Sequence, residues 1–107
     1  MMKLTLPTLA IAATIFAGGA FAFDPDDLQK LKDTGDCVKC DLSGANLEGA
    51  DLTSATLMSA NLSYANLNDV DLEGANLKDA NLSYAKMKGA MLCNTTMPNG
   101  SVIYSDC

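Results

Sequence analysis

The stretch that decides the fold, residues 60–84, reads ANLSYANLNDVDLEGANLKDANLSY. Written in fives, it gives ANLSY, ANLND, VDLEG, ANLKD and ANLSY, with Leu always at the third place and Asn or Asp always at the second. A fixed internal period is typical of a repeat architecture, in which each short unit packs only against its neighbours. The two copies of ANLSY are therefore either a duplicated site or two equivalent pieces of scaffold.

The same frame extends from residue 40 to residue 99 and gives twelve quintets. The first place is Ala in nine of them and is replaced by Cys40, Val70 and Thr95 in the others. The third place is apolar throughout, and we call its residues the core ladder: Leu42, Leu47, Leu52, Leu57, Leu62, Leu67, Leu72, Leu77, Leu82, Met87, Leu92 and Met97.

A period of five suits neither a helix, which repeats every 3.6 residues, nor a flat strand, which repeats every two. The chain must turn at every quintet, so four quintets would close one square coil of twenty residues. The core ladder and the small first-place residues would then point inward together, because only a small residue fits beside each Leu in a narrow core. Asx side chains and Gly would supply the turns, and successive coils would pair in parallel about 4.8 Å apart.

The quintets ANLEG, ADLTS, ANLSY, ANLND and ANLKD resemble the pentapeptide repeat family, whose consensus is A-(D/N)-L-x-x. The resemblance implies an all-β fold, a right-handed quadrilateral parallel β-helix of about three coils that rises about 14 Å at the usual strand spacing. The late quintets depart from the consensus, because Lys86, Met91 and Thr96 replace the Asx residue. The ending LCNTTMPNG…C also resembles small exported members of the family.

Both ends of the repeat are predicted to be covered, because solenoids need caps. Residues 23–36 predict a short N-terminal capping helix, with Asp24 as N-cap, Pro25 at the first position and Gly35 as the stop. Leu28 and Leu31 would form its apolar face. The β-helix is then assigned to residues 37–99, and residues 100–107, with a closing strand at 102–104, form a C-terminal cap.

Residues 1–22 have the three parts of a secretory signal peptide: a Lys near the start, an apolar run and an A-x-A site that ends at Ala22. The mature chain would begin at Phe23 and carry a net charge of -7, from 6 Lys and 13 acidic residues. We therefore expect an exported protein of a periplasm, a thylakoid lumen or the extracellular space. In its mature form it would have no membrane segment.

Export favours disulfides for Cys37, Cys40, Cys93 and Cys107, and four cysteines allow three pairings. In the solenoid that the resemblance implies, Cys37–Cys40 and Cys93–Cys107 are local pairs. Crossed pairs would span nearly three coils, farther than the roughly 7 Å between Cα atoms that a disulfide tolerates. A redox function of the C-x-x-C pair is the alternative interpretation.

Residues twenty apart would form outward columns on the coil surface. Tyr64 and Tyr84 share one column, which is either a binding platform or a pair that shields the coil edge; we favour the second interpretation. Asp51 and Asp71 share another, close to Glu73, and a solvated acidic face is favoured over a calcium site. No metal site or cofactor is predicted.

Composition excludes several functions. The chain has no His, Trp or Arg and carries a net charge of -6, which argues against nucleic acid as a partner and against the usual hydrolytic catalysts. We predict an exported, non-enzymatic scaffold or protein-interaction module, a monomer or weak dimer, whose protein partner the sequence does not identify. Two alternatives stay open: an acidic DNA mimic that inhibits DNA gyrase, as the family resemblance suggests, and a thiol-disulfide protein that uses Cys37 and Cys40.

Overall fold

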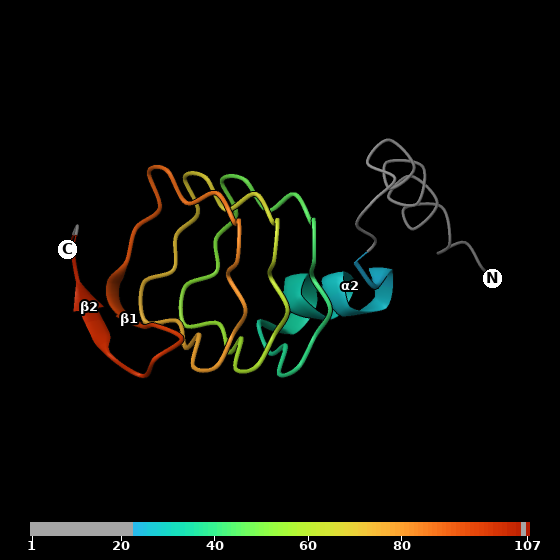
Figure 1. The fold of residues 1–107 in the computed structure, drawn as a ribbon, viewed down its shortest axis with the longest axis horizontal. Coiled ribbons are helices and arrows are strands. Elements are labelled where there is room, and N and C mark those ends of the chain that lie inside the picture. Colours follow the sequence, from blue (N-terminus) through green and yellow to red (C-terminus); the bar gives the residue numbers. More distant parts are fainter. Residues whose placement is uncertain (1–22, 106) are drawn as a thin grey trace.

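The fold is described by a computed structural model that places residues 23–105 and 107. It contains the helix α2 (Pro25–Thr34) and the strands β1 (Cys93–Thr96) and β2 (Val102–Tyr104), in that order. Between α2 at one end and the strands at the other, the chain winds in stacked coils (Figure 1). The predicted signal peptide lies outside the described residues.

The coils are joined by isolated parallel bridges, each between residues twenty apart, which is the coil length that the repeat predicts. Two consecutive bridges, Asn61 with Asn81 and Asn66 with Lys86, lie on neighbouring sides of the coil. The full set runs from Asp36–Thr56 to Asn76–Thr96, so the bridged segment extends over residues 36–96. The two copies of ANLSY are thus the same side of consecutive coils.

Each side of a coil uses three backbone hydrogen bonds to hold the next coil. On the ANLSY side, the N–H of Leu62 donates to the carbonyl of Asn81 (2.8 Å) and the N–H of Tyr64 to that of Ser83 (2.9 Å). The N–H of Asn81 returns a bond to the carbonyl of Ala60 (2.9 Å). The third and fifth residues therefore donate toward one end of the solenoid, and the second residue donates toward the other.

A tight turn follows the third residue of each quintet. The N–H of Ala65, for example, donates to the carbonyl of Leu62 at 3.1 Å, while Tyr64 between them has φ 61°. A positive φ at this place is the signature of a type II turn, which favours Gly. Gly occupies it at residues 44, 49, 74 and 89, but elsewhere the place holds side-chain residues.

The Asx residues stand at the second place of the quintet, just before the tight turn. The Oδ1 atom of Asn61 accepts from the N–H of Ser63 (3.0 Å), two residues on, and Oδ1 of Asp51 accepts in the same way from the N–H of Thr53 (3.0 Å). Such Asx turns satisfy the one backbone N–H of each quintet that points neither to the next coil nor into the turn. The second-place preference of the repeat follows from this bond.

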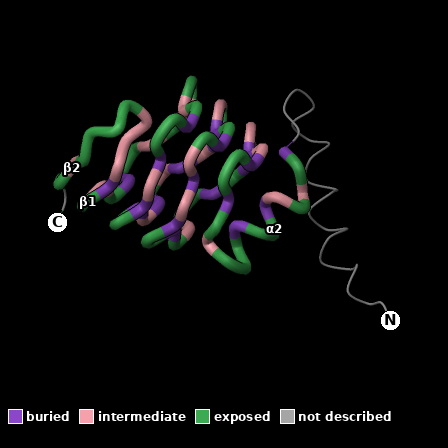
Figure 2. The backbone as a smooth tube through the Cα atoms, turned by 90° about the horizontal axis from the view of Figure 1, so that it is seen from below, coloured by how far each residue is buried: buried purple, intermediate pink, exposed green. Residues whose placement is uncertain are grey.

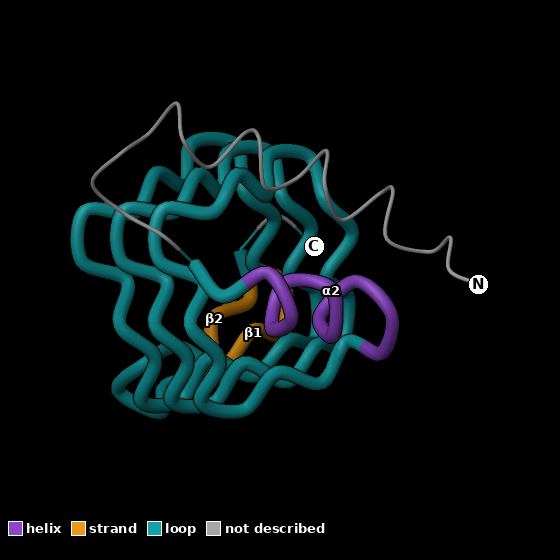
Figure 3. Tube along the Cα trace, turned by 90° about the vertical axis from the view of Figure 1, so that its right-hand side faces the viewer, coloured by secondary structure: helices purple, strands orange, loops and turns teal. Residues whose placement is uncertain are grey.

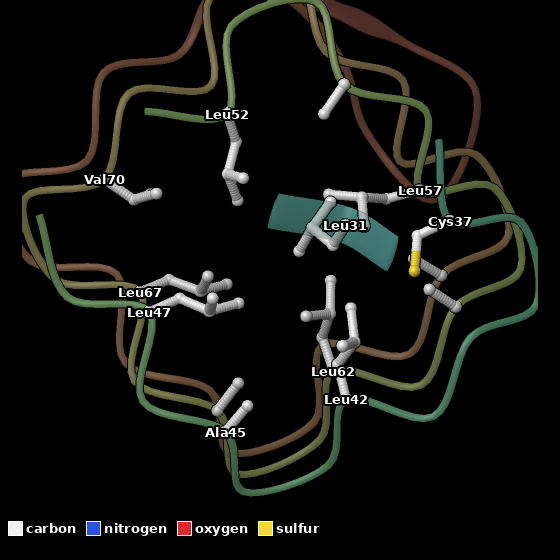
Figure 4. Packing of buried hydrophobic residues seen from close by; sticks show 14 of the residues in the cluster. Leu31, Cys37, Leu42, Ala45, Leu47, Leu52, Leu57, Leu62, Leu67 and Val70 are labelled. Carbon is white, nitrogen blue, oxygen red and sulfur yellow. The ribbon is translucent and has the colours of Figure 1, made fainter. Parts of the chain in front are cut away.

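The core ladder is buried over the first two coils and opens in the third. Its members from Leu42 to Leu77 are at most 6% exposed, whereas Leu82, Met87, Leu92 and Met97 are only partly buried. The last four members are less buried because the described chain adds no fourth coil above these residues. Figure 2 shows the burial pattern, and Figure 4 shows Leu42, Leu47, Leu62 and Leu67 pointing into the coil.

The helix α2 lies at the opening of the first coil (Figure 3). Its ends are those the sequence predicts: Asp24 is the N-cap, and Gly35 follows with φ 73°. Leu28 and Leu31 are buried in the same core as the coils, and Figure 4 places Leu31 in the middle of the coil.

One side of the first coil was missed by the twelve-quintet frame. Residues 35–39, GDCVK, form an earlier side, because Asp36 pairs with Thr56 and Lys39 has φ 64° at the fifth place. Cys37 takes the third place and is fully buried there. The frame hides this side because Gly and Cys stand where Ala and Leu are expected.

The C-terminal residues turn back on the last coil. The predicted closing strand, β2, pairs antiparallel with β1, with Cys93 opposite Tyr104 and Thr96 opposite Val102. Thr95, at a first place, is fully buried, and its hydroxyl donates to the carbonyl of Leu72 (2.7 Å). A polar residue is tolerated inside the coil because its hydrogen bond is made.

Truncating the core ladder should cost more inside the stack than at its open end. We expect Leu62→Ala to lower the free energy of unfolding by about 3–5 kcal/mol, because it leaves a closed cavity. Leu82→Ala, in the same column one coil later, should cost about half as much, because solvent already reaches the site. Urea unfolding followed by circular dichroism measures both, and equal losses would contradict the partial burial of the third coil.

Candidate interaction surfaces and disulfides

Two disulfides lie at opposite ends of the solenoid. Cys37 is bonded to Cys40 with 5.2 Å between the Cα atoms, and Cys93 is bonded to Cys107 with 4.9 Å. These are the two local pairs expected from the sequence. No free cysteine occurs among the described residues.

The C-x-x-C disulfide is part of the core. Cys37 is 0% and Cys40 3% exposed, at a third and a first place of the repeat, and Cys37 Sγ lies 3.2 Å from the carbonyl oxygen of Asp27 in α2. Thiol-disulfide exchange requires a thiolate to reach a sulfur atom in line. Burial under α2 denies that access, so the geometry favours a structural bond over a redox centre.

Tyr64 and Tyr84 stack on the surface. Their ring centroids are 4.9 Å apart and the ring planes differ by 14°, while the side chains are 45% and 77% exposed. Both residues have φ 61°, a left-handed conformation that costs an L-residue other than Gly roughly 1–2 kcal/mol. One ring stack contributes about 0.5–1.5 kcal/mol, less than the roughly 2–4 kcal/mol that two such backbone conformations cost, so the pair adds no net stability.

The column of Asp51 and Asp71, called the acidic column below, is also present in the structure, because the two residues pair through a parallel bridge. The hydroxyl and then the backbone N–H of Thr53 donate to the Asp51 carboxylate and lower its pKa below the ordinary 3.8. Asp71 likewise accepts from the N–H of Glu73 (3.0 Å). The column stops in the third coil, where the next bridge joins Asp71 to Met91.

The carboxylates of this column are thus occupied by their own turns. Within residues 23–105 and 107, no group of three His, Cys, Asp or Glu side chains is arranged to hold a metal ion. The column is a short row of acids at the coil surface.

The family model for pentapeptide repeats, described as eight copies, matches residues 36–74 and 60–97. The chain therefore belongs to the pentapeptide repeat family. The match begins at residue 36, which includes the side of the coil that the twelve-quintet frame omits.

Solved structures of the same family are similar to this chain. A pentapeptide repeat protein from the cyanobacterium Cyanothece 51142 is 33% identical, with a TM-score of 0.46, over 65% of this chain and 47% of that one. HetL, involved in heterocyst differentiation regulation in Nostoc sp. strain PCC 7120, is 30% identical, with a TM-score of 0.32, over 64% of this chain and 43% of that one. The chain thus spans less than half the length of these two proteins.

A third pentapeptide repeat protein, also from Nostoc, is 23% identical, with a TM-score of 0.38, over 81% of this chain and 89% of that one. Curated protein sequences provide no significant match. Within the described part of the chain, α2 is the helix, and neither it nor any other helical segment has the length and apolar character that crossing a membrane requires.

The two disulfides should differ in accessibility. We expect a mild reductant without denaturant to open Cys93–Cys107 first, because Cys107 is exposed, and to leave the buried Cys37–Cys40 pair intact. Alkylation of new thiols followed by peptide mass spectrometry gives the order. Preferential opening of Cys37–Cys40 would restore the redox interpretation.

The Asp51 pKa should depend on the Thr53 hydroxyl. A lowered pKa means that this group stabilises the fold above pH 3.8 and loses that contribution as the pH falls through the folded-state value. Thr53→Val should raise the Asp51 pKa toward its ordinary value, whereas Thr53→Ser, which keeps the hydroxyl, should leave it unchanged. NMR titration of the carboxyl carbon measures the shift, and identical values for both variants would exclude the hydroxyl as the cause.

Glycine should be the better replacement for the exposed tyrosine. Because φ at residue 84 is positive, Tyr84→Gly should be more stable than Tyr84→Ala by about 1 kcal/mol. It should also lie within about 1 kcal/mol of the natural chain, since lost stacking and relieved strain nearly cancel. Thermal unfolding compares the three proteins, and an Ala variant at least as stable as the Gly variant would show that the backbone is not strained.

Proposed function

We propose that this chain is an exported, non-enzymatic interaction module that binds a protein partner through the side of the solenoid that carries Tyr64 and Tyr84. The family supports a scaffold or interaction role in general. The specific role rests on the tyrosine pair, which is the observation that carries the proposal.

The pair supports a binding role because the fold has no need of it. The same turn place holds Gly in four quintets, and Gly would occupy it without strain. Two large aromatic side chains are kept exposed there instead, at a backbone cost of roughly 2–4 kcal/mol for the two residues, more than the roughly 0.5–1.5 kcal/mol that one stack returns. Exposed tyrosines are enriched in protein interfaces, where the ring packs and the hydroxyl stays hydrogen-bonded.

The scaffold around the pair is suited to presenting a fixed surface. Leu62 lies in the core between the coil before and the coil after, and it is fully buried. The backbone N–H groups of Leu62 and Tyr64 both donate hydrogen bonds to the next coil. We further propose that the coil is right-handed and four-sided, as in the family, and that α2 acts as its N-terminal cap. The buried Leu28 and Leu31 support that capping role.

Export is supported by the signal-peptide pattern of residues 1–22 and by two disulfides in so small a chain. The two alternatives have less support. The DNA-mimic alternative needs a continuous acidic face, but the acidic column ends at Met91 and the third coil adds Lys86 and Lys88. The redox alternative needs an accessible sulfur, which the burial of Cys37 and Cys40 opposes.

The interaction is tested by capture from envelope extracts of the producing cell on the immobilised protein. We expect one protein to be retained by the natural chain and by Val38→Ser, a control that removes an exposed apolar side chain elsewhere. The Tyr64→Ser/Tyr84→Ser variant should no longer retain this protein.

Export is tested separately by amino-terminal sequencing of the protein that the cell accumulates, which should start at Phe23. Capture that does not depend on the tyrosines, or a chain that keeps residues 1–22, would contradict the proposal.

A further inference from the structure

The first two sides of the third coil, residues 80–84 and 85–89, form an edge with unused backbone donors. In the coil before, the N–H groups of Leu62, Tyr64, Leu67 and Asp69 each donate to a carbonyl of the third coil. The equivalent N–H groups of Leu82, Tyr84, Met87 and Gly89 have no acceptor among the described residues. We call residues 80–89 the open edge.

The rest of the last coil is partly covered by the C-terminal residues. β1 pairs with β2, the N–H of Met97 donates to Ser101 (2.7 Å), and the disulfide holds Cys107 to Cys93. The C-terminal strand pair in Figure 1 therefore belongs to the part of the coil after residue 90. The open edge is a sheet edge of the kind that can accept another strand.

The open edge is chemically distinct from the rest of the surface. Residues 80–105 contain Lys86 and Lys88 and no acidic residue, whereas residues 23–79 contain 12 acids and 4 Lys. Both Lys86 and Lys88 are exposed. By the pattern of the earlier coils, the edge has four donors against two acceptors, the carbonyls of Ala80 and Ala85.

The edge is also apolar on its inner side. Leu82 and Met87 are only partly buried there, and Tyr84 is exposed at the end of the tyrosine column. A strand that paired with this edge would cover all three side chains while it supplied acceptors to the free N–H groups.

The opposite end of the solenoid shows how an acidic segment meets a coil edge in this fold. There the N–H of Asp41 donates to the Asp27 carboxylate of α2 (2.8 Å). The N–H of Asp24 donates to the carbonyl of Asp41 (3.0 Å). At Asp41, a carboxylate and an extended backbone segment together meet the N–H and the carbonyl of that edge.

We propose that the open edge binds an extended acidic segment of another protein, which pairs with residues 80–89 as an added strand. This rests on the proposed interaction role and assigns the partner's chemistry: backbone carbonyls accept from the free N–H groups, and carboxylates face Lys86 and Lys88. A second copy of the chain fits less well. Two open edges would oppose donors to donors and lysines to lysines.

The test uses the isotope-labelled protein, in the form that the producing cell accumulates, and the synthetic peptide acetyl-ADLEGADLEG-amide. We expect the amide signals of Leu82, Tyr84, Met87 and Gly89 to shift on titration, and their hydrogen exchange to slow about tenfold or more. A peptide with Lys at every acidic place should bind at least about tenfold more weakly.

Charge reversal in the protein gives the matched control. Lys86→Glu/Lys88→Glu should weaken binding at least about tenfold, whereas Lys30→Glu/Lys32→Glu, the same change on α2, should leave it nearly unchanged. Lys86→Gln/Lys88→Gln should give an intermediate loss and shows that the effect follows charge. Unchanged circular dichroism of each variant keeps the comparison valid.

Three results would overturn the proposal: no shift of the four amides at excess peptide, equal binding of the lysine peptide, or shifts that follow protein concentration alone, which would assign the edge to a second copy. Failure here is distinguishable from failure of the proposed function. The peptide titration reads the open edge and its lysines, whereas the capture experiment reads the tyrosine pair.

Discussion

The structure depends on hydrogen bonds between backbone groups twenty residues apart. Where two coils stack, each side of the earlier coil donates from its third and fifth residues to the later one, and the later coil donates back from its second residue. This register can be kept only if the chain turns once every five residues, because an extra residue would move Leu out of the core and Asx out of its turn. The five-residue repeat of the sequence therefore follows from the hydrogen-bond register between coils.

The same constraint explains why the side chains have such narrow roles. The first and third places face a core that is filled by Ala and Leu, the second place closes an Asx turn, and the fifth place adopts a positive φ. The outward side chains are then the variable part. A positive φ at the fifth place makes large side chains expensive there, and the stacked tyrosines are therefore the most informative residues on the surface.

Much of the fold could be predicted from the sequence because each local choice agrees with the coil. The period predicted the coil length. Asp24, Pro25 and Gly35 predicted the two ends of α2, and the residues after Pro98 predicted the closing strand. The earlier side at residues 35–39 was missed because Cys37 stands in place of Leu. The partial exposure of the core ladder from Leu82 onward could not be predicted from composition, because burial there depends on what lies above the last coil.

The candidate surface was less predictable than the fold. The sequence placed Tyr64 over Tyr84 but gave no reason to suspect strain, since the sign of φ at the fifth place follows from the turn geometry and not from residue type. The open edge was equally hidden, because unused N–H groups appear only once the bonding direction of each place is known. Tyr84 and the open edge both lie on the third coil, at the end of the solenoid opposite α2.

Amide hydrogen exchange of the uncomplexed protein tests the account most directly. The N–H groups of Leu62, Tyr64 and Leu67 are bonded between coils and should exchange through global unfolding, whereas those of Leu82, Tyr84 and Met87 should exchange rapidly at the open edge. Uniform protection across both sets, or rapid exchange of both, would contradict a stacked coil of twenty residues that ends in a free edge.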